Sequence, residues 1–153
     1  MRTQMTRSVS PTKFLIEEET RHIHVAVVEA ERTTSAEIKV VLARHCWGDI
    51  KAKARRVFKT LGLDGTQQRN AVLLLFVVTN REFLIYGDEG IHAKVGQDFW
   101  DDVRDEMAQA FARDAFGDGI ANGVRRIGEK LALHFPRGQD DVDEISNEIV
   151  YTR

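Results

Sequence analysis

The longest apolar run of the chain lies near its centre and is followed by a short polar turn. Ala71 to Val78 is almost wholly apolar, and a second apolar run, Phe83 to Tyr86, follows Thr79-Asn80-Arg81. Two such runs joined by a short turn predict an antiparallel hairpin. Because the first run lacks polar alternation, it is typical of a strand that is covered on both faces.

Apolar residues recur at helical spacing in four further stretches, which predicts four helices. The segment from Glu37 to Ala43, between the first two helices, alternates and then turns apolar, as strands do. Asp49 and Asp118 stand at the expected starts of the second and fourth helices, and Asp118 fits an N-cap. The apolar positions of the four helices are Ile16, Ile23, Val27 and Ala30; Ile50, Ala54, Val57, Phe58 and Leu61; Phe99, Val103, Met107, Ala110 and Phe111; and Ile120, Val124, Ile127, Leu131 and Phe135.

The order of these elements is helix, strand, helix, strand, strand, helix, helix, which predicts an α/β fold. A strand–helix–strand unit implies two parallel strands with a right-handed crossover, and the hairpin adds a third, antiparallel strand. We therefore expect a small mixed β-sheet with helices on both faces. Residues 14–136 are expected to form one domain. The polar terminal extensions 1–13 and 137–153 flank it, and the acidic tail is expected to be loosely ordered and dispensable for folding. Its apolar residues Ile145, Ile149, Val150 and Tyr151 leave open that the tail docks on the domain or on a second copy.

Length and composition narrow the class of protein. A chain of 153 residues is long enough for one full core. Its formal net charge of −2 argues against nucleic acid as the default partner. No stretch approaches the ~18 apolar residues of a membrane span, and Met1 to Phe14 lacks the apolar centre of a signal peptide. The lone Cys46 cannot form an internal disulfide. We therefore expect a cytoplasmic protein without membrane insertion.

The predicted topology brings several polar residues to one edge of the sheet. Glu37 and Arg69-Asn70 lie at the starts of the parallel strands, and Asp88-Glu89 follow the end of the third strand. Asp88 and Glu89 could ligate Ca²⁺ or Mg²⁺, or could cap the helix that follows. Arg69 and Asn70 could orient a phosphate or pair with those carboxylates. Glu37 could complete the same site, or it could be a solvated strand residue.

Other charged groups offer weaker candidates. Asp101 and Asp105, with Asp98 and Asp102, form an acidic stripe at helical spacing that could converge on one cation or could be a solvated helix face. Together with Asp118 they are further candidate metal ligands. The second helix is rich in lysine and arginine, which could bind an acidic partner or simply face water. His45 and Cys46 are adjacent on an extended chain and point to opposite sides, which argues against a His-activated thiol.

Four motifs carry a resemblance to a known family. They are Glu31-x-Thr33-Thr34-x-x-Glu37-Ile38, Gln68-Arg69-Asn70-Ala71-Val72-Leu73, Tyr86-Gly87-Asp88-Glu89-Gly90-Ile91 and Asp118-Gly119-Ile120-x-x-Gly123. Together they resemble the TPM domain, a family named partly for a thylakoid-lumen phosphatase. The tail Asp143 to Ile149 looks like the ending of stand-alone cytoplasmic members. The resemblance implies a three-layer α/β sandwich with acidic residues that bind divalent cations. Some members of the family are described as acid phosphatases.

Three functions follow as hypotheses. The first is a domain that binds a divalent cation, Ca²⁺ or Mg²⁺, in a structural or partner-docking role. The second is a metal-dependent, acid-phosphatase-like hydrolase, in which the cation would polarise a phosphoryl oxygen and Arg69 would hold another. The third is a metal-free module that binds an unidentified protein partner. The sequence contains no Cys-x5-Arg loop, no Gly-x-Ser-x-Gly elbow and no Gly-x-x-x-x-Gly-Lys loop, so whether the protein is an enzyme stays open.

Overall fold

The structure is a computed structural model that describes residues 7–138 and 146–153. Asp143 to Ile145, which belong to the tail motif, lie outside the described residues. The elements in chain order are α1 (Pro11–Phe14), α2 (Glu17–Thr33), β1 (Glu37–Ala43), α3 (Ile50–Thr60), a short 3-10 helix η1 (Leu63–Gly65), β2 (Ala71–Val77), β3 (Glu82–Gly87), α4 (Glu89–His92), α5 (Gln97–Ala112), α6 (Phe116–His134) and β4 (Val150–Thr152).

The strands form one mixed sheet in the order β3-β2-β1-β4. β1 and β2 are parallel, with Glu37 opposite Ala71 and Ala43 opposite Val77. β2 and β3 are antiparallel, which confirms the hairpin. Every residue of β2 is buried, as expected for a strand with neighbours on both edges and helices on both faces.

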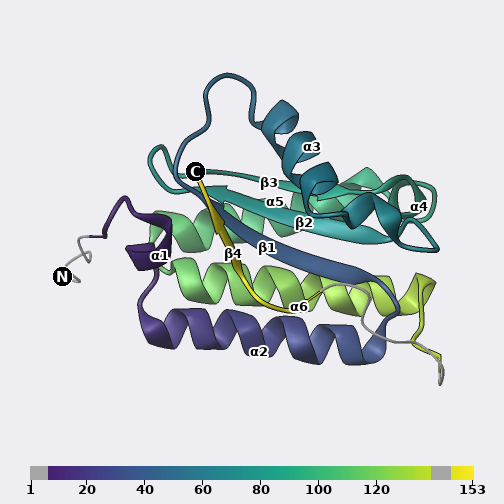
Figure 1. The fold of residues 1–153 in the computed structure, drawn as a ribbon. Coiled ribbons are helices and arrows are strands. Elements are labelled where there is room, and N and C mark those ends of the chain that lie inside the picture. Colours follow the sequence, from purple (N-terminus) through teal and green to yellow (C-terminus); the bar gives the residue numbers. More distant parts are fainter. Residues whose placement is uncertain (1–6, 139–145) are drawn as a thin grey trace.

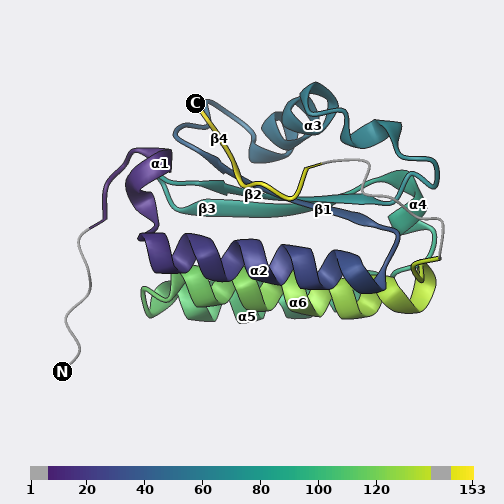
Figure 2. The same ribbon diagram turned by 60° about the horizontal axis from the view of Figure 1, so that its bottom comes forward.

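Helices cover both faces of the sheet, so the α/β sandwich is confirmed. Figure 2 shows α3 on one side, with α2, α5 and α6 on the other. The alternation of side chains along β1 and β2 divides the core accordingly. Ile38 and Leu74 pack in the larger cluster under α2, α5 and α6, whereas Val41 and Leu75 pack in the smaller cluster under α3. None of the helices in residues 7–138 and 146–153 has the length and apolar character needed to cross a bilayer.

The start of α3 is set by a nearby side chain, whereas the start of α6 is capped by a side chain from another helix. Asp49 caps α3, where its carboxylate accepts a hydrogen bond from the amide of Lys51. The prediction that Asp118 caps the last helix is wrong. α6 begins two residues earlier at Phe116, and the Glu19 carboxylate on α2 accepts the hydrogen bond from the Gly117 amide at 3.0 Å. A side chain from another helix therefore supplies the cap.

The end of the chain contributes a fourth strand, a possibility that the sequence left open beside the expectation of a loosely ordered tail. β4 runs parallel to β1, with Val150 opposite Val41 and Thr152 opposite Ala43. Val150 packs against the core cluster under α3, and the ammonium of Lys39 donates a hydrogen bond to the carbonyl oxygen of Ser146 at 2.6 Å. Figure 1 shows this strand lying along the outer edge of β1. Residues 146–153 are therefore part of the folded domain.

Removing the tail is accordingly expected to destabilise the domain. Truncation after Gly138 uncovers the edge of β1 and removes the partly buried Val150, at a cost of about 1–2 kcal/mol. This corresponds to a thermal midpoint lower by roughly 2–8 °C for a chain of this size. Circular dichroism melts of the two proteins measure the shift, with Tyr151→Ser in the full chain as a control. A midpoint equal to that of the full chain would contradict the packing of β4.

Candidate functional site

Arg69, Asp88 and Glu89 meet at one edge of the sheet, as the topology predicted. Arg69 Nε donates to Asp88 Oδ2 at 2.7 Å, and Arg69 Nη2 donates to Asp88 Oδ1 at 2.9 Å. Arg69 Nη1 lies 3.3 Å from Glu89 Oε1. The Asp88 side chain is 7% exposed and that of Arg69 is 41% exposed. The hydrogen bond to Asp88 raises the pKa of Arg69, so the guanidinium is permanently charged. The carboxylates of Asp88 and Glu89 therefore both contact the guanidinium of Arg69.

The backbone at this edge is unusually tight. Arg69 has φ +50, a left-handed conformation that is uncommon for residues with a side chain. The Gly90 amide donates to the carbonyl oxygen of Arg69 at 2.9 Å. A Cβ at position 90 would lie 2.3 Å from the carbonyl oxygen of Gln68, so only glycine fits there. The motif glycine therefore serves to bring α4 against the entrance to β2.

Asp88 also caps α4, because its Oδ1 accepts a hydrogen bond from the Glu89 amide at 2.8 Å. The expectation that these carboxylates could cap the following helix is thereby confirmed for Asp88. The same carboxylate binds Arg69 and caps α4, which fixes its position.

Neutral polar groups continue the edge towards β1. The Ser35 hydroxyl accepts hydrogen bonds from Asn70 Nδ2 at 3.3 Å and from Gln68 Nε2 at 3.1 Å. The backbone N–H of Asn70 donates to the Thr66 hydroxyl at 3.0 Å, and Asn70 is 1% exposed. Asn70 therefore joins the loop before β2 to the loop before β1, next to the Arg69–Asp88 pair.

A group of buried charges at the start of β1 was not expected. Glu37 is 3% exposed, so its interpretation as a solvated strand residue is wrong. Lys39, two residues along the same strand, is 4% exposed, and Glu31 accepts a hydrogen bond from the Ile38 amide at 2.7 Å. Burial lowers the pKa of Lys39, and the nearby charges of Glu31, Glu148 and Glu37 partly offset this effect. The sequence signal was present, since two charged residues alternate within an otherwise apolar strand.

The remaining acidic candidates lie on other elements. Asp101 and Asp105 are on α5, where Arg104 contacts both at 3.5 and 3.4 Å. Asp118 lies in the first turn of α6, and its carboxylate is 4.0 Å from His22 Nδ1 on α2. Within residues 7–138 and 146–153, no three histidine, cysteine, aspartate or glutamate side chains are grouped so that they could hold a metal ion. The structure brings Arg69, Asp88 and Glu89 together and leaves the α5 and α6 candidates apart from them.

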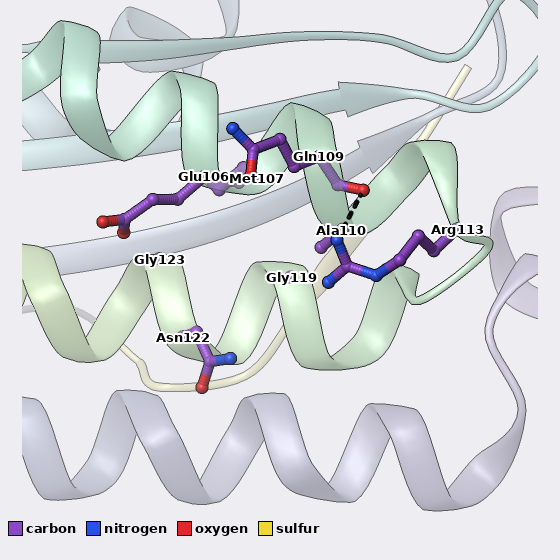
Figure 3. Close-up of a pocket in the computed structure, with 8 residues that line it drawn as sticks. All are labelled: Glu106, Met107, Gln109, Ala110, Arg113, Gly119, Asn122 and Gly123. Carbon is purple, nitrogen blue, oxygen red and sulfur yellow. Dashed lines mark hydrogen bonds between the residues drawn. The ribbon is translucent and has the colours of Figure 1, made fainter.

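A separate pocket lies between α5 and α6 (Figure 3). Gly119 and Gly123 line it and allow close helix packing, since a Cβ on Gly123 would lie 2.7 Å from the sulfur of Met107. Its polar groups do not converge on a common point. Arg113 Nη1 donates to the carbonyl oxygen of Gln109, and Glu106 pairs with Arg126. The pocket is therefore a packing groove, and the sheet edge is the better candidate site.

Comparison with known proteins agrees with the motifs at this edge. The family model of the TPM domain matches residues 8–130. The structure is also similar to the NMR structure of the BA42 protein from the psychrophilic bacterium Bizionia argentinensis, with a TM-score of 0.85 and 38% sequence identity over 90% of this chain and 95% of that chain. Comparison with curated proteins gives no match. Because the family model spans most of the chain and includes Arg69, Asp88 and Glu89, this protein belongs to the TPM domain family.

Proposed function

We propose that this TPM domain binds a divalent cation, Ca²⁺ or Mg²⁺, through Asp88 and Glu89 at the sheet edge, in a structural or partner-docking role. The observation that carries the proposal is that both carboxylates face the same guanidinium, at 2.7 and 3.3 Å. A position that already accommodates one positive charge between two acids is electrostatically suited to another cation.

The surroundings of the two carboxylates support the proposal. Both ions prefer oxygen ligands, and Ca²⁺ accepts six to eight of them, including backbone and amide carbonyl oxygens as well as water. Asp88 is held in place by its role as a helix cap. Arg69 is 41% exposed, so its side chain can swing into water when a metal ion displaces it.

The hydrolase hypothesis shares the cation but asks more of Arg69. To hold a phosphoryl group, Arg69 would use the planar, two-pronged edge of its guanidinium. The two nitrogens of one such edge, Nε and Nη2, donate hydrogen bonds to Asp88. Both hypotheses require Arg69 to leave Asp88, but only hydrolysis also requires the freed guanidinium to hold a phosphoryl oxygen, so cation binding with a docking role is the simpler proposal. Hydrolysis of a phosphate ester, measured with and without Ca²⁺ or Mg²⁺, distinguishes the two hypotheses.

Arg69 and the cation should compete, which makes a sharp test. Millimolar Ca²⁺ or Mg²⁺ is expected to raise the thermal midpoint, because a ligand that binds only the native state stabilises it by mass action. Arg69→Gln removes the competing internal cation and should strengthen the response. Asp88→Asn with Glu89→Gln should abolish it, and the apo protein should stay folded because asparagine also caps helices. Differential scanning fluorimetry and isothermal titration calorimetry measure these effects.

The matched control is Asp101→Asn with Asp105→Asn, which removes the same charge from the acidic stripe on α5. This variant should keep the full cation response. If it loses the response while the Asp88/Glu89 variant keeps it, the site lies on α5. If the wild type responds to neither metal by either method, the carboxylates serve only Arg69 and α4, and the metal-free interaction module becomes the leading function.

A further inference from the structure

One segment of this chain carries a strong net positive charge. Residues 44–60 hold six basic residues and one acid, Asp49, in a protein whose formal net charge is −2. Elsewhere, arginines such as Arg7 and Arg69 form ion pairs with carboxylates. None of the six basic residues does so with the residues that the structure describes, although Lys53 donates a hydrogen bond to the carbonyl oxygen of Arg153. We call these six residues the basic surface: Arg44, Lys51, Lys53, Arg55, Arg56 and Lys59.

The fold turns these charges outward. Ala54 and Phe58 of α3 are buried against the sheet, which leaves the opposite side of the helix to water. Lys51, Arg55 and Arg56 are exposed there. Without internal partners, these charges repel one another, so an anionic partner would gain from all of them at once. Charge complementarity therefore identifies the partner of this surface as anionic.

A large aromatic side chain stands beside the basic surface. Trp47 is 84% exposed, and no other large apolar side chain in residues 7–138 and 146–153 is as exposed. Its ring stacks on His45, with centroids 5.1 Å apart. Gly48, with φ +93, allows the turn that follows. Figure 1 shows this loop projecting beyond the sheet next to the start of α3. Burying this ring against a partner would remove its apolar surface from water, which is favourable.

We infer that Trp47 and the basic surface form a peripheral docking surface for an anionic lipid bilayer. Tryptophan prefers the headgroup region of membranes, where its ring is buried and its N–H remains hydrated. Each lysine or arginine near an anionic bilayer strengthens binding by roughly fivefold. A nucleic acid strand fits less well, because its binding sites place successive aromatic side chains along a groove. Here a single aromatic tip precedes a convex helix.

The test uses the full-length protein and vesicles of defined composition. The chain has two tryptophans, so Trp100→Phe leaves Trp47 as the only tryptophan fluorophore. Mixed vesicles of phosphatidylglycerol and phosphatidylcholine are expected to sediment with the protein and to shift the Trp47 emission to shorter wavelength. Vesicles of phosphatidylcholine alone should do neither. Added salt should reverse the binding, because it screens exposed charges.

Two charge-reversal variants distinguish the effect of the basic surface on vesicle binding from the effect of the protein's net charge. Lys51→Glu with Arg55→Glu should weaken partitioning at least roughly 25-fold. Arg113→Glu with Arg125→Glu changes the net charge equally at exposed positions on the other side of the sheet and should leave partitioning largely intact. Trp47→Ala should weaken partitioning by a similar factor at low and at moderate salt, because its contribution is apolar and is not screened.

Three outcomes would overturn the inference. One is a lack of binding to anionic vesicles at low salt. Another is an equal loss in both charge-reversal variants, which would mean that only net charge matters. The third is a Trp47 emission shift with single-stranded oligonucleotides or with polyglutamate but not with vesicles, which would assign the surface to nucleic acid or to an acidic protein.

Discussion

Replacing Leu74 by aspartate is expected to unfold most of the protein. Leu74 is fully buried in β2, opposite Val40 of β1 and Ile85 of β3, in the core cluster under α2, α5 and α6. Aspartate would leave a cavity and place a carboxylate where apolar side chains surround it. The expected cost is about 5 kcal/mol or more, which is comparable with the whole stability of a typical domain. Urea denaturation followed by circular dichroism measures the loss.

An exposed leucine provides the control for this substitution. Leu133, near the end of α6, is 76% exposed, so Leu133→Asp makes the same chemical change in water. Its urea midpoint should stay close to that of the wild type, and its free energy of unfolding should differ by no more than about 0.5 kcal/mol. Leu74→Met keeps the volume and should cost less than about 1.5 kcal/mol. If Leu74→Asp unfolds at the wild-type midpoint, β2 cannot be the central buried strand.

The elements with strong local patterns were predictable from the sequence. The strand Glu37–Ala43 has the bounds expected from its alternation, and Asp49 caps the helix that it was expected to open. These features are local, because hydrophobic periodicity and capping involve residues within a few positions of one another. The meeting of Arg69 with Asp88 was also predictable, since the direction of a hairpin alone returns the chain to its starting edge.

The features that sequence analysis missed depend on contacts between distant residues. β4 is three residues long and follows an acidic stretch, and only its pairing with β1 makes it a strand. Glu37 was expected at the site edge, but its burial depends on what covers β1. α6 starts earlier than Asp118, and its Gly117 amide is capped by Glu19, which lies 98 positions away from Gly117 in the chain. Local pattern carries no information about such pairs. The pairing of Arg69 with Asp88 and the cap of α4 by Asp88 were among the alternatives that the sequence offered, whereas the contacts of Asn70 and Gln68 with Ser35 were not.

Replacing Arg7 by methionine is expected to be the other strongly destabilising substitution. The Arg7 side chain is 1% exposed, and all of its N–H groups are used. They donate to Glu19 at 2.7 and 3.0 Å, to the Asp114 carboxylate and carbonyl oxygen at 3.0 Å each, and to the carbonyl oxygen of Phe14 at 3.0 Å. The guanidinium also lies 4.8 Å from the Phe116 ring centroid. Methionine keeps most of the side-chain volume but leaves the carboxylates of Glu19 and Asp114 without their ion-pair partner. The free energy of unfolding, measured by urea denaturation, is expected to fall by about 3–5 kcal/mol.

The dependence on pH tests whether the carboxylates cause this loss. Burial alone would raise the pKa of Glu19, but hydrogen bonds from Arg7, Ile16 and Gly117 outweigh it and hold the pKa below the ordinary value of 4.5. A lowered pKa in the folded state means that this stabilisation is complete above pH 4.5 and is lost as the pH falls through the folded value. Arg7→Met removes a hydrogen bond and a positive charge that both lower the pKa of Glu19, so this pKa should be higher in the variant than in the wild type, and acid should relieve the unpaired charge. The stability difference between wild type and Arg7→Met should therefore be widest at neutral pH and should narrow below pH 4.5. Adding Glu19→Gln to Arg7→Met should recover part of the loss at neutral pH. A difference that stays constant with pH, together with no recovery in the double variant, would assign the effect of Arg7 to packing against the phenylalanine rings instead.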